Sequence, residues 1–309
     1  MLKIIASLLF SIFLSAAASA QSCGSLPNTL ANGTNADATQ VMANFNVLLN
    51  CANSSRQVLT ASRTYYVRTD GNDSNNGLTN SSSGAFLTIQ RAINAVAALD
   101  ISTFNVTVNV ADGTYTGAIV VNGAWLGSGT VSLIGNTSTP SNVVVNVTGN
   151  ALIVQSGGRL SVGGFKFIST AVGTYAYDKG TIIISAPCEW GANASYNVYA
   201  DTFGAIRFDA NPTFSGTGGF AAIGVQTFGT VNIATRTLTV SGTPAFTSSF
   251  ASSSLNGLIV ANGFSFTGSG ATGSRYSATT GGGIFTFGGG ANIFPGSSAG
   301  SATSPGWYN

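Results

Sequence analysis

Three residues could carry acid–base chemistry: Asp178, Lys179 and Asp201. Asp178 stands two residues before Gly180, and Asp201 stands three residues before Gly204. Each of these glycines begins a short sequence phrase in which apolar residues alternate with other residues. If these phrases are strands stacked in parallel, the two carboxylates lie on neighbouring strands about 4.8 Å apart, a separation typical of retaining glycosidases. Lys179 could instead act as the base of a polysaccharide lyase. The alternative is a pair of solvated turn residues, because turn chemistry alone favours aspartate near glycine.

A second acidic segment, Asp70-Gly-Asn-Asp73, could bind calcium, because hard cations take clustered carboxylate and carbonyl oxygens. The segment lacks the spacing and the final glutamate of an EF-hand, so a polar loop that covers one end of the domain is the alternative. The chain has no histidine, which excludes serine triads and histidine bases. No cofactor other than this calcium is expected.

Aromatic residues gather in the same part of the sequence as the two aspartates. If their rings face outward, they form a groove floor for sugar rings, with Asn and Thr supplying hydrogen bonds. If they face inward, they are ordinary stacking in a core, and both orientations stay open at this point. The residues are Tyr175, Tyr177, Trp190, Tyr196, Tyr199 and Phe203.

Repeats between Gly158 and Gly268 must position these residues. Five phrases begin with glycine and continue with alternating apolar residues, and their glycines are 22, 24, 25 and 28 residues apart. This period predicts a solenoid, and the alternation predicts strands with one inward face, stacked into parallel ladders over residues 63–270. The phrases begin at Gly158, Gly180, Gly204, Gly229 and Gly257.

Composition and the first residues indicate where the protein acts. Charged residues make up only 6% of the chain and the net charge is +2, which argues against a nucleic-acid partner. Residues 1–20 have the pattern of a signal peptide, with Lys3, an apolar run from Ile4 to Leu14 and Ala18-Ser-Ala20. No second hydrophobic span follows, so we expect a protein outside the cytoplasm without a membrane span.

Residues 21–62 are expected to form a small helical module. Asn35 or Asp37 could cap a helix whose apolar face would pack on the next domain or on copies of itself. Cys23 and Cys51 bracket the module and could form a disulfide in an oxidising compartment, whereas Cys188 is expected to be a small buried side chain. The apolar face consists of Val41, Phe45, Leu48 and Leu49.

The segment from Tyr65 to Gly117 contains the phrases YYVRTDGNDSNNGL, FLTIQRAINAV and VNVADGTYTG. It resembles the opening of right-handed parallel β-helix proteins of the pectin-lyase-like superfamily, where such phrases form the first strand and the helix that caps the solenoid. The resemblance implies an all-β, right-handed parallel β-helix. It implies little about activity, because this fold hosts lyases, glycosidases, adhesins and phage tailspikes.

The two ends of the chain resemble a more specific group of β-helix proteins. Leu26 to Asn50 resembles an N-terminal segment of phage and prophage tail-fibre-like proteins, and Gly273 to Asn309 resembles their Gly-rich tail, which is expected at 271–309. This implies a homotrimeric tail-fibre or tailspike-like protein at the virion surface that contacts cell-surface glycans without catalysis. Virion proteins assembled in the cytoplasm need no signal peptide. A secreted polysaccharide lyase or glycoside hydrolase, and an exported surface adhesin, therefore stay open.

Overall fold

The computed structural model describes residues 25–30, 37–54, 56–216, 219–268 and 270–309. The chain divides after Arg56 into two compact units, which are described separately. The predicted signal sequence 1–20, Cys23 and Asn35 lie outside the described residues. The second unit begins at Gln57 rather than at residue 63, because β1 (Gln57–Val58) pairs in parallel with β3 (Leu99–Asp100).

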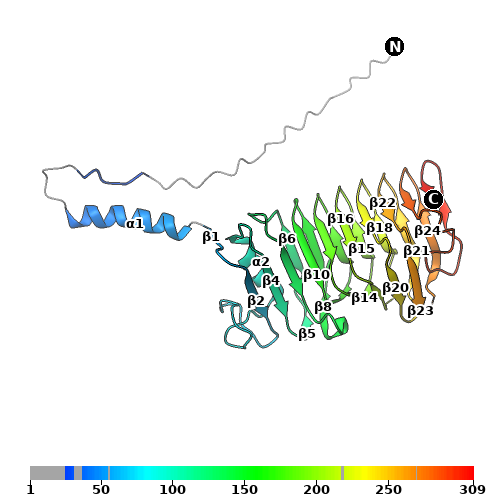
Figure 1. The fold of residues 1–309 in the computed structure, drawn as a ribbon, viewed down its shortest axis with the longest axis horizontal. Helices are drawn as coiled ribbons and strands as arrows, with labels where there is room; N and C mark the ends of the chain where they lie inside the picture. The colour runs from blue at the N-terminus through cyan, green and yellow to red at the C-terminus, as the bar shows by residue number, and fades with distance from the viewer. Residues whose placement is uncertain (1–24, 31–36, 55, 217–218, 269) are drawn as a thin grey trace, which may run out of the picture. The chain divides into compact units, whose positions relative to one another are not determined.

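The second unit is a right-handed parallel β-helix of about eight turns, so the predicted fold class is confirmed (Figure 1). Each full coil contributes one strand to each of three parallel sheets, which we call sheets 1, 2 and 3. Sheet 1 contains β2 (Arg63–Val67), β4 (Val106–Val110), β7 (Val131–Ile134), β10 (Arg159–Gly163), β13 (Thr181–Ile184), β16 (Ala205–Phe208), β19 (Thr230–Asn232), β22 (Leu258–Val260), β25 (Gly283–Phe285) and β27 (Trp307–Tyr308).

Sheets 2 and 3 complete the coils. Sheet 2 contains β5 (Gly113–Tyr115), β8 (Val143–Val147), β11 (Lys166–Ser169), β14 (Glu189–Asn193), β17 (Thr213–Phe214), β20 (Thr237–Val240) and β23 (Ser265–Gly268). Sheet 3 contains β6 (Ile119–Asn122), β9 (Leu152–Gln155), β12 (Val172–Ala176), β15 (Tyr196–Ala200), β18 (Ala221–Val225), β21 (Ala245–Ser253), β24 (Thr272–Ala278) and β26 (Ser301–Ala302). A short 3-10 helix, η1 (Pro140–Asn142), precedes β8.

The five predicted phrases form five successive strands of sheet 1, from β10 to β22. Their apolar residues at the second position after glycine pair in register and are buried, so they form one continuous ladder inside the β-helix. The members of the ladder are Leu160, Ile182, Ile206, Val231 and Ile259.

A two-residue turn carries the chain from sheet 3 into sheet 1, and it recurs in successive coils. Asp178–Lys179 and Thr202–Phe203 both adopt left-handed backbone conformations, with φ between 44° and 63°. The glycine that follows donates its N–H to the carbonyl three residues earlier, at 2.8 Å in Gly180 and in Gly204. Neighbouring turns also bond to each other, since Lys179 N–H donates to Thr202 O at 3.1 Å.

The repeated glycine is required by close approach of the preceding coil. A Cβ on Gly180 would lie 1.8 Å from the carbonyl oxygen of Val154, and a Cβ on Gly204 would lie 2.1 Å from that of Ala176. No such contact is tolerated by real side chains, so any other residue would push the coils apart. A glycine therefore recurs once per coil in this part of the chain, at the place where neighbouring coils approach closely.

The N-terminal end of the β-helix is covered by α2 (Ile89–Ala97), the predicted capping helix. Thr88 is its N-cap, with Oγ1 accepting from Arg91 N–H at 3.2 Å, and its apolar residues are buried. Gln90 covers the edge of β6, because its Nε2 donates to Val120 O at 3.1 Å and its Oε1 accepts from Val120 N–H at 2.7 Å. The side chain thus replaces a missing neighbouring strand.

The segment expected as a Gly-rich tail, 271–309, instead continues the β-helix through β24, β25, β26 and β27. Its glycines make room for large side chains of neighbouring coils. A Cβ on Gly283 would lie 2.3 Å from the Trp307 ring, and one on Gly300 would lie 2.2 Å from the Tyr276 ring. The high glycine content therefore reflects packing in the last coils, which a composition-based interpretation as a tail misses.

In the first unit, α1 (Ala38–Ser54) confirms the predicted helix. Asp37 caps it, since its Oδ1 accepts from Thr39 N–H at 2.8 Å and its carbonyl oxygen accepts from Val41 N–H at 3.1 Å. Cys51 is disulfide-bonded and Cys188 is a free, buried thiol. The pairing of Cys51 with Cys23 stays a prediction, because Cys23 lies outside the described residues. No described helix is long and apolar enough to cross a membrane.

The glycine requirement gives a stability test. We expect Gly180→Ala to lower the free energy of unfolding by about 2–3 kcal/mol or more, because its Cβ would overlap the preceding coil. Gly117→Ala is the matched control, since a Cβ there meets nothing within 4 Å. Urea unfolding followed by circular dichroism measures both variants. Equal stabilities of the two variants would contradict the close-approach explanation.

Candidate functional site

The outer face of sheet 3 carries a cluster of stacked aromatic side chains. Tyr175 stacks on Tyr199 with ring centroids 5.1 Å apart, and Tyr199 stacks on Tyr196 at 4.3 Å with the planes only 10° apart. Tyr177 contacts Tyr175 at 5.6 Å, and Phe220 meets Tyr196 edge-on at 5.4 Å. The predicted tyrosines are therefore brought together on the outside of the β-helix.

The local sequence explains why these rings point outward and lie flat. Thr174 and Ala176 occupy the inward positions of β12 and are fully buried, so Tyr175 between them points to the outer face. Tyr199 pairs with Tyr175 in register and with Gly224 in the next coil. A Cβ on Gly224 would lie 2.3 Å from the Tyr196 ring, so this glycine leaves the space in which that ring lies.

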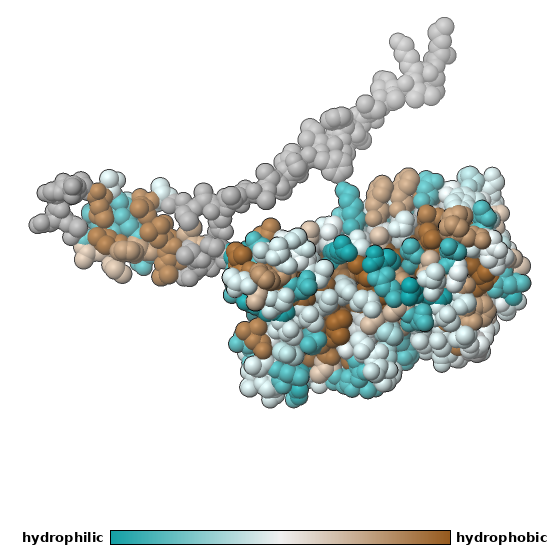
Figure 2. Space-filling model, in the orientation of Figure 1, coloured by the Kyte–Doolittle hydropathy of each residue, from teal (hydrophilic) through white to brown (hydrophobic). Residues whose placement is uncertain are grey.

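Two phenylalanines extend the aromatic surface to the edge where sheet 3 turns into sheet 1. Phe203 and Phe228 stack with centroids 5.1 Å apart and planes 5° apart, and they are 56% and 50% exposed. Hydrophobic side chains stand out along this edge in Figure 2. We define the aromatic surface as Tyr175, Tyr177, Tyr196, Tyr199, Phe203, Phe220 and Phe228.

Both phenylalanines have a strained backbone, with φ of 61° and 62°. The left-handed conformation costs a non-glycine residue roughly 1–2 kcal/mol, and equivalent turns in other coils place Gly157 and Asn256 at this position. Large apolar side chains are thus held exposed at a site where smaller residues fit better. Strain of this kind concentrates at functional sites.

The tyrosine hydroxyls are proton donors rather than bases or nucleophiles. Burial, reinforced by the negative charge of Asp201, raises the pKa of Tyr175 to about 12. The same two causes raise the pKa of Tyr199 further, and also that of Tyr196. Tyr199 donates its hydroxyl hydrogen to Gln226 Oε1 at 2.8 Å. At neutral pH these hydroxyls are protonated and can only donate or accept hydrogen bonds.

The proposed catalytic residues Asp178 and Asp201 lie in neighbouring coils and are offset by one residue along the chain. Asp201 directly precedes its two-residue turn, at the place that Tyr177 has in the preceding coil. Asp178 is the first residue of its turn, at the place that Thr202 has in the next coil. Asp201 Oδ1 accepts from Thr202 N–H at 2.7 Å. Among the described residues no hydrogen bond or ion pair joins Asp178, Lys179 and Asp201. The offset by one residue was visible in the sequence as their different distances from glycine.

Trp190 lies in the core and is 0% exposed, so it does not belong to a sugar-binding surface. It points inward because it occupies an inward position of β14, where its ring packs against Phe167, Phe208 and Phe214 at 6.0, 5.7 and 5.3 Å. Sequence reasoning missed Phe220 and Phe228. Phe228 could have been found by aligning the turns, because it stands directly before a repeat glycine, as Phe203 does.

The acidic segment proposed for calcium is engaged by protein groups. Asp70 accepts two hydrogen bonds from Arg68 at 2.8 and 3.1 Å, and this contact lowers the pKa of its carboxyl. Asp73 Oδ1 accepts from the N–H groups of Leu87 and Thr88, both at 2.9 Å, and its Oδ2 accepts from Thr88 Oγ1. The part of the chain that the structure describes holds no group of three or more Cys, Asp and Glu side chains placed to share a metal ion.

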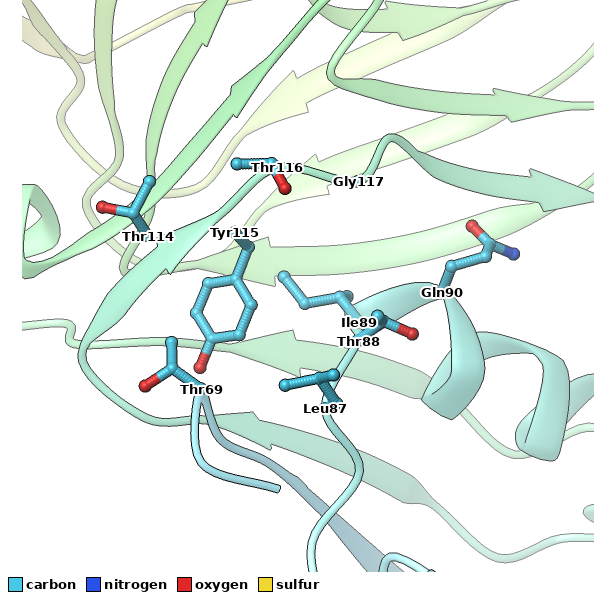
Figure 3. Close-up of a pocket in the computed structure, with 9 residues that line it drawn as sticks. All are labelled: Thr69, Leu87, Thr88, Ile89, Gln90, Thr114, Tyr115, Thr116 and Gly117. Atoms are coloured by element: carbon cyan, nitrogen blue, oxygen red, sulfur yellow. The ribbon is translucent and has the colours of Figure 1, made fainter. Parts of the chain in front are cut away.

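A hollow of about 230 Å³ lies between β5 and the start of α2 (Figure 3). The Tyr115 ring points into the space beside Leu87 and Ile89, and four threonines also line the hollow, Thr69, Thr88, Thr114 and Thr116. Tyr115 donates to Ala111 O at 2.9 Å, and burial raises its pKa to about 12. Because no lining group titrates near neutral pH, this hollow offers no acid–base catalyst.

No known family model matches this chain, and comparisons with curated proteins and with solved structures give no match.

The raised tyrosine pKa predicts a fall in stability at alkaline pH. The folded protein holds the Tyr175 proton up to a pKa of about 12, whereas the unfolded chain releases it near 10. The resulting stabilisation is fully present below pH 10 and is lost as the pH rises from 10 to 12. Urea unfolding across this range should show the decline. Tyr175→Phe should flatten it in part, because Tyr115 and Tyr308 also have a raised pKa of about 12. An identical decline in the variant would contradict the assignment.

Proposed function

We propose that the protein is a phage or prophage tail-fibre or tailspike-like β-helix whose aromatic surface binds an uncharged glycan without cleaving it. The observation that carries this proposal is the exposed Phe203–Phe228 pair, held on strained turns beside protonated tyrosines. Aromatic rings stack on the apolar faces of sugars, and hydroxyl and amide groups nearby bond to sugar hydroxyls. The sequence resemblance of both ends to tail-fibre-like proteins supports the biological setting.

The charge of the surface favours uncharged sugars. Asp201 lies close enough to Tyr175 and Tyr199 to raise the pKa of both hydroxyls, and it would repel an acidic sugar placed over them. Catalysis is not part of the proposal, because Asp178 and Asp201 are offset and the tyrosines hold their protons. An exported adhesin would use the same surface and differ only in its location.

We expect wild-type protein to bind at least one member of an array of purified bacterial O-antigen and capsular polysaccharides. Phe203→Asn with Phe228→Asn should weaken that binding about tenfold or more, because loss of about 1.4 kcal/mol of stacking energy corresponds to tenfold. Asparagine tolerates the left-handed turn, as Asn256 does, so the fold should persist.

Leu255→Ala serves as the control, since it removes an exposed apolar side chain from the same row of turns. The bound glycan should be recovered intact, with no new reducing ends. Undiminished binding by the double Asn variant would refute the site. Cleavage that disappears in Asp178→Asn with Asp201→Asn would instead establish the enzyme alternative.

We also propose that copies of the chain associate through α1. Phe45, Leu48 and Leu49 are exposed on one face of the helix, together with Met42. Hydrophobic side chains cover part of this helix in Figure 2. Ala38, Val41, Phe45, Leu48 and Ala52 follow the alternating spacing of three and four residues that is typical of helices packed on one another. The helix contains no charged residue that would oppose contact with its own copy.

We expect the full-length protein to be a homotrimer, so light scattering should give three times the mass of one chain. Phe45→Asp with Leu48→Asp should shift it to a monomer, because buried carboxylates would repel each other across the seam. Asn46→Asp with Asn50→Asp adds the same charge outside the heptad seam and should leave the mass unchanged. A monomeric wild-type protein would exclude this association.

A further inference from the structure

The outer face of sheet 1 carries a second hollow, distinct from the aromatic surface. It is a groove of about 270 Å³ that crosses β7, β10, β13 and β16. Small side chains make its floor, because Ser132 and Ser161 pair in register at outward positions of β7 and β10. Ile183 and Arg207 continue the same row on β13 and β16 and bound the groove on that side.

Hydroxyl groups in the groove are held in place. Ser161 Oγ donates to Ser185 Oγ at 2.7 Å, and Ser185 Oγ bonds to Val162 O at 3.4 Å. These contacts join neighbouring coils, and both serines line the groove. Trp125 stands at the opposite side, where its indole N–H donates to Arg159 O at 2.5 Å. The groove thus combines polar floor groups with one aromatic wall.

The charge of the groove is positive. Arg207 is paired with Asp209, whose carboxylate accepts from Nε at 2.8 Å and from Nη2 at 2.7 Å. Arg159 is exposed, and among the described residues no ion pair involves it. One guanidinium therefore remains available at the groove, which Trp125 also lines. Such a group binds planar anionic oxygens through two parallel hydrogen bonds.

We propose that this groove binds the anionic group of an acidic polysaccharide, either a carboxylate or a sulfate ester. Arg159 contacts the anionic oxygens, Ser161 and Ser185 bond to sugar hydroxyls, and the Trp125 ring packs against a sugar face. The groove and the aromatic surface have opposite charge preferences, because Asp201 stands beside the tyrosines and Arg159 stands here. The inference goes beyond the uncharged glycan site and does not depend on it.

Affinity electrophoresis at physiological ionic strength tests the proposal with three polymers. Dextran sulfate presents sulfate esters, alginate presents carboxylates, and dextran is the uncharged control. Wild-type protein should be retarded by at least one of the two anionic polymers and not by dextran. Retardation by only one of them identifies the ester or the carboxylate as the ligand group.

Three variants separate a built groove from general charge attraction. Arg159→Gln should weaken retardation at least fivefold, and so should Ser161→Leu, which fills the floor without changing charge. Arg275→Gln removes the same charge from sheet 3 and should have no effect. The proposal is overturned if neither anionic polymer retards the protein, or if Arg275→Gln weakens retardation as much as Arg159→Gln.

The double Asn variant of the aromatic surface separates the two sites. It should keep wild-type retardation by the anionic polymer even though it loses the uncharged glycan. Loss of that retardation in this variant would mean that the groove is not an independent site, and would overturn the inference.

Discussion

The structure depends on how closely one coil can approach the next at the turn between sheets 3 and 1. At Gly180, Gly204 and Gly229 the carbonyl oxygen of the preceding coil comes within a distance that excludes any Cβ. With the coils at this spacing, their strands pair in register and their apolar residues form continuous ladders. The same spacing places side chains of neighbouring coils close enough for rings to stack. The stacked rings of the aromatic surface are a consequence of this spacing between coils.

Side chains that point outward from the sheets do not have to fill the core of the β-helix. These positions can therefore carry residues that bind a ligand. Along sheet 3 they hold tyrosines, with Asp201 directly after β15, and along sheet 1 they hold serines and arginines. One scaffold therefore presents two faces of different chemistry. Both are suited to binding, which is the role we propose for them.

Much of the fold could be predicted from the sequence, because the glycine period and the alternation of apolar residues arise directly from coil stacking. The helix over Ile89–Ala97 could be predicted because its sequence resembles the capping helix of other β-helix proteins and because its apolar residues have helical spacing. The last coils could not, since Gly283 and Gly300 make room for distant rings that composition does not reveal. The orientation of Trp190 and Tyr175 also required the register, because alternation alone does not say which of two adjacent positions faces the core.

We propose that the aromatic surface holds a sugar against Phe203 and Phe228. A crystal structure of the protein with an oligosaccharide derived from the glycan it binds would test this proposal. We expect an intact oligosaccharide with a ring stacked on these two side chains and hydroxyls within reach of the tyrosines. An oligosaccharide bound elsewhere with this edge empty, or one cleaved beside Asp178 and Asp201, would contradict it.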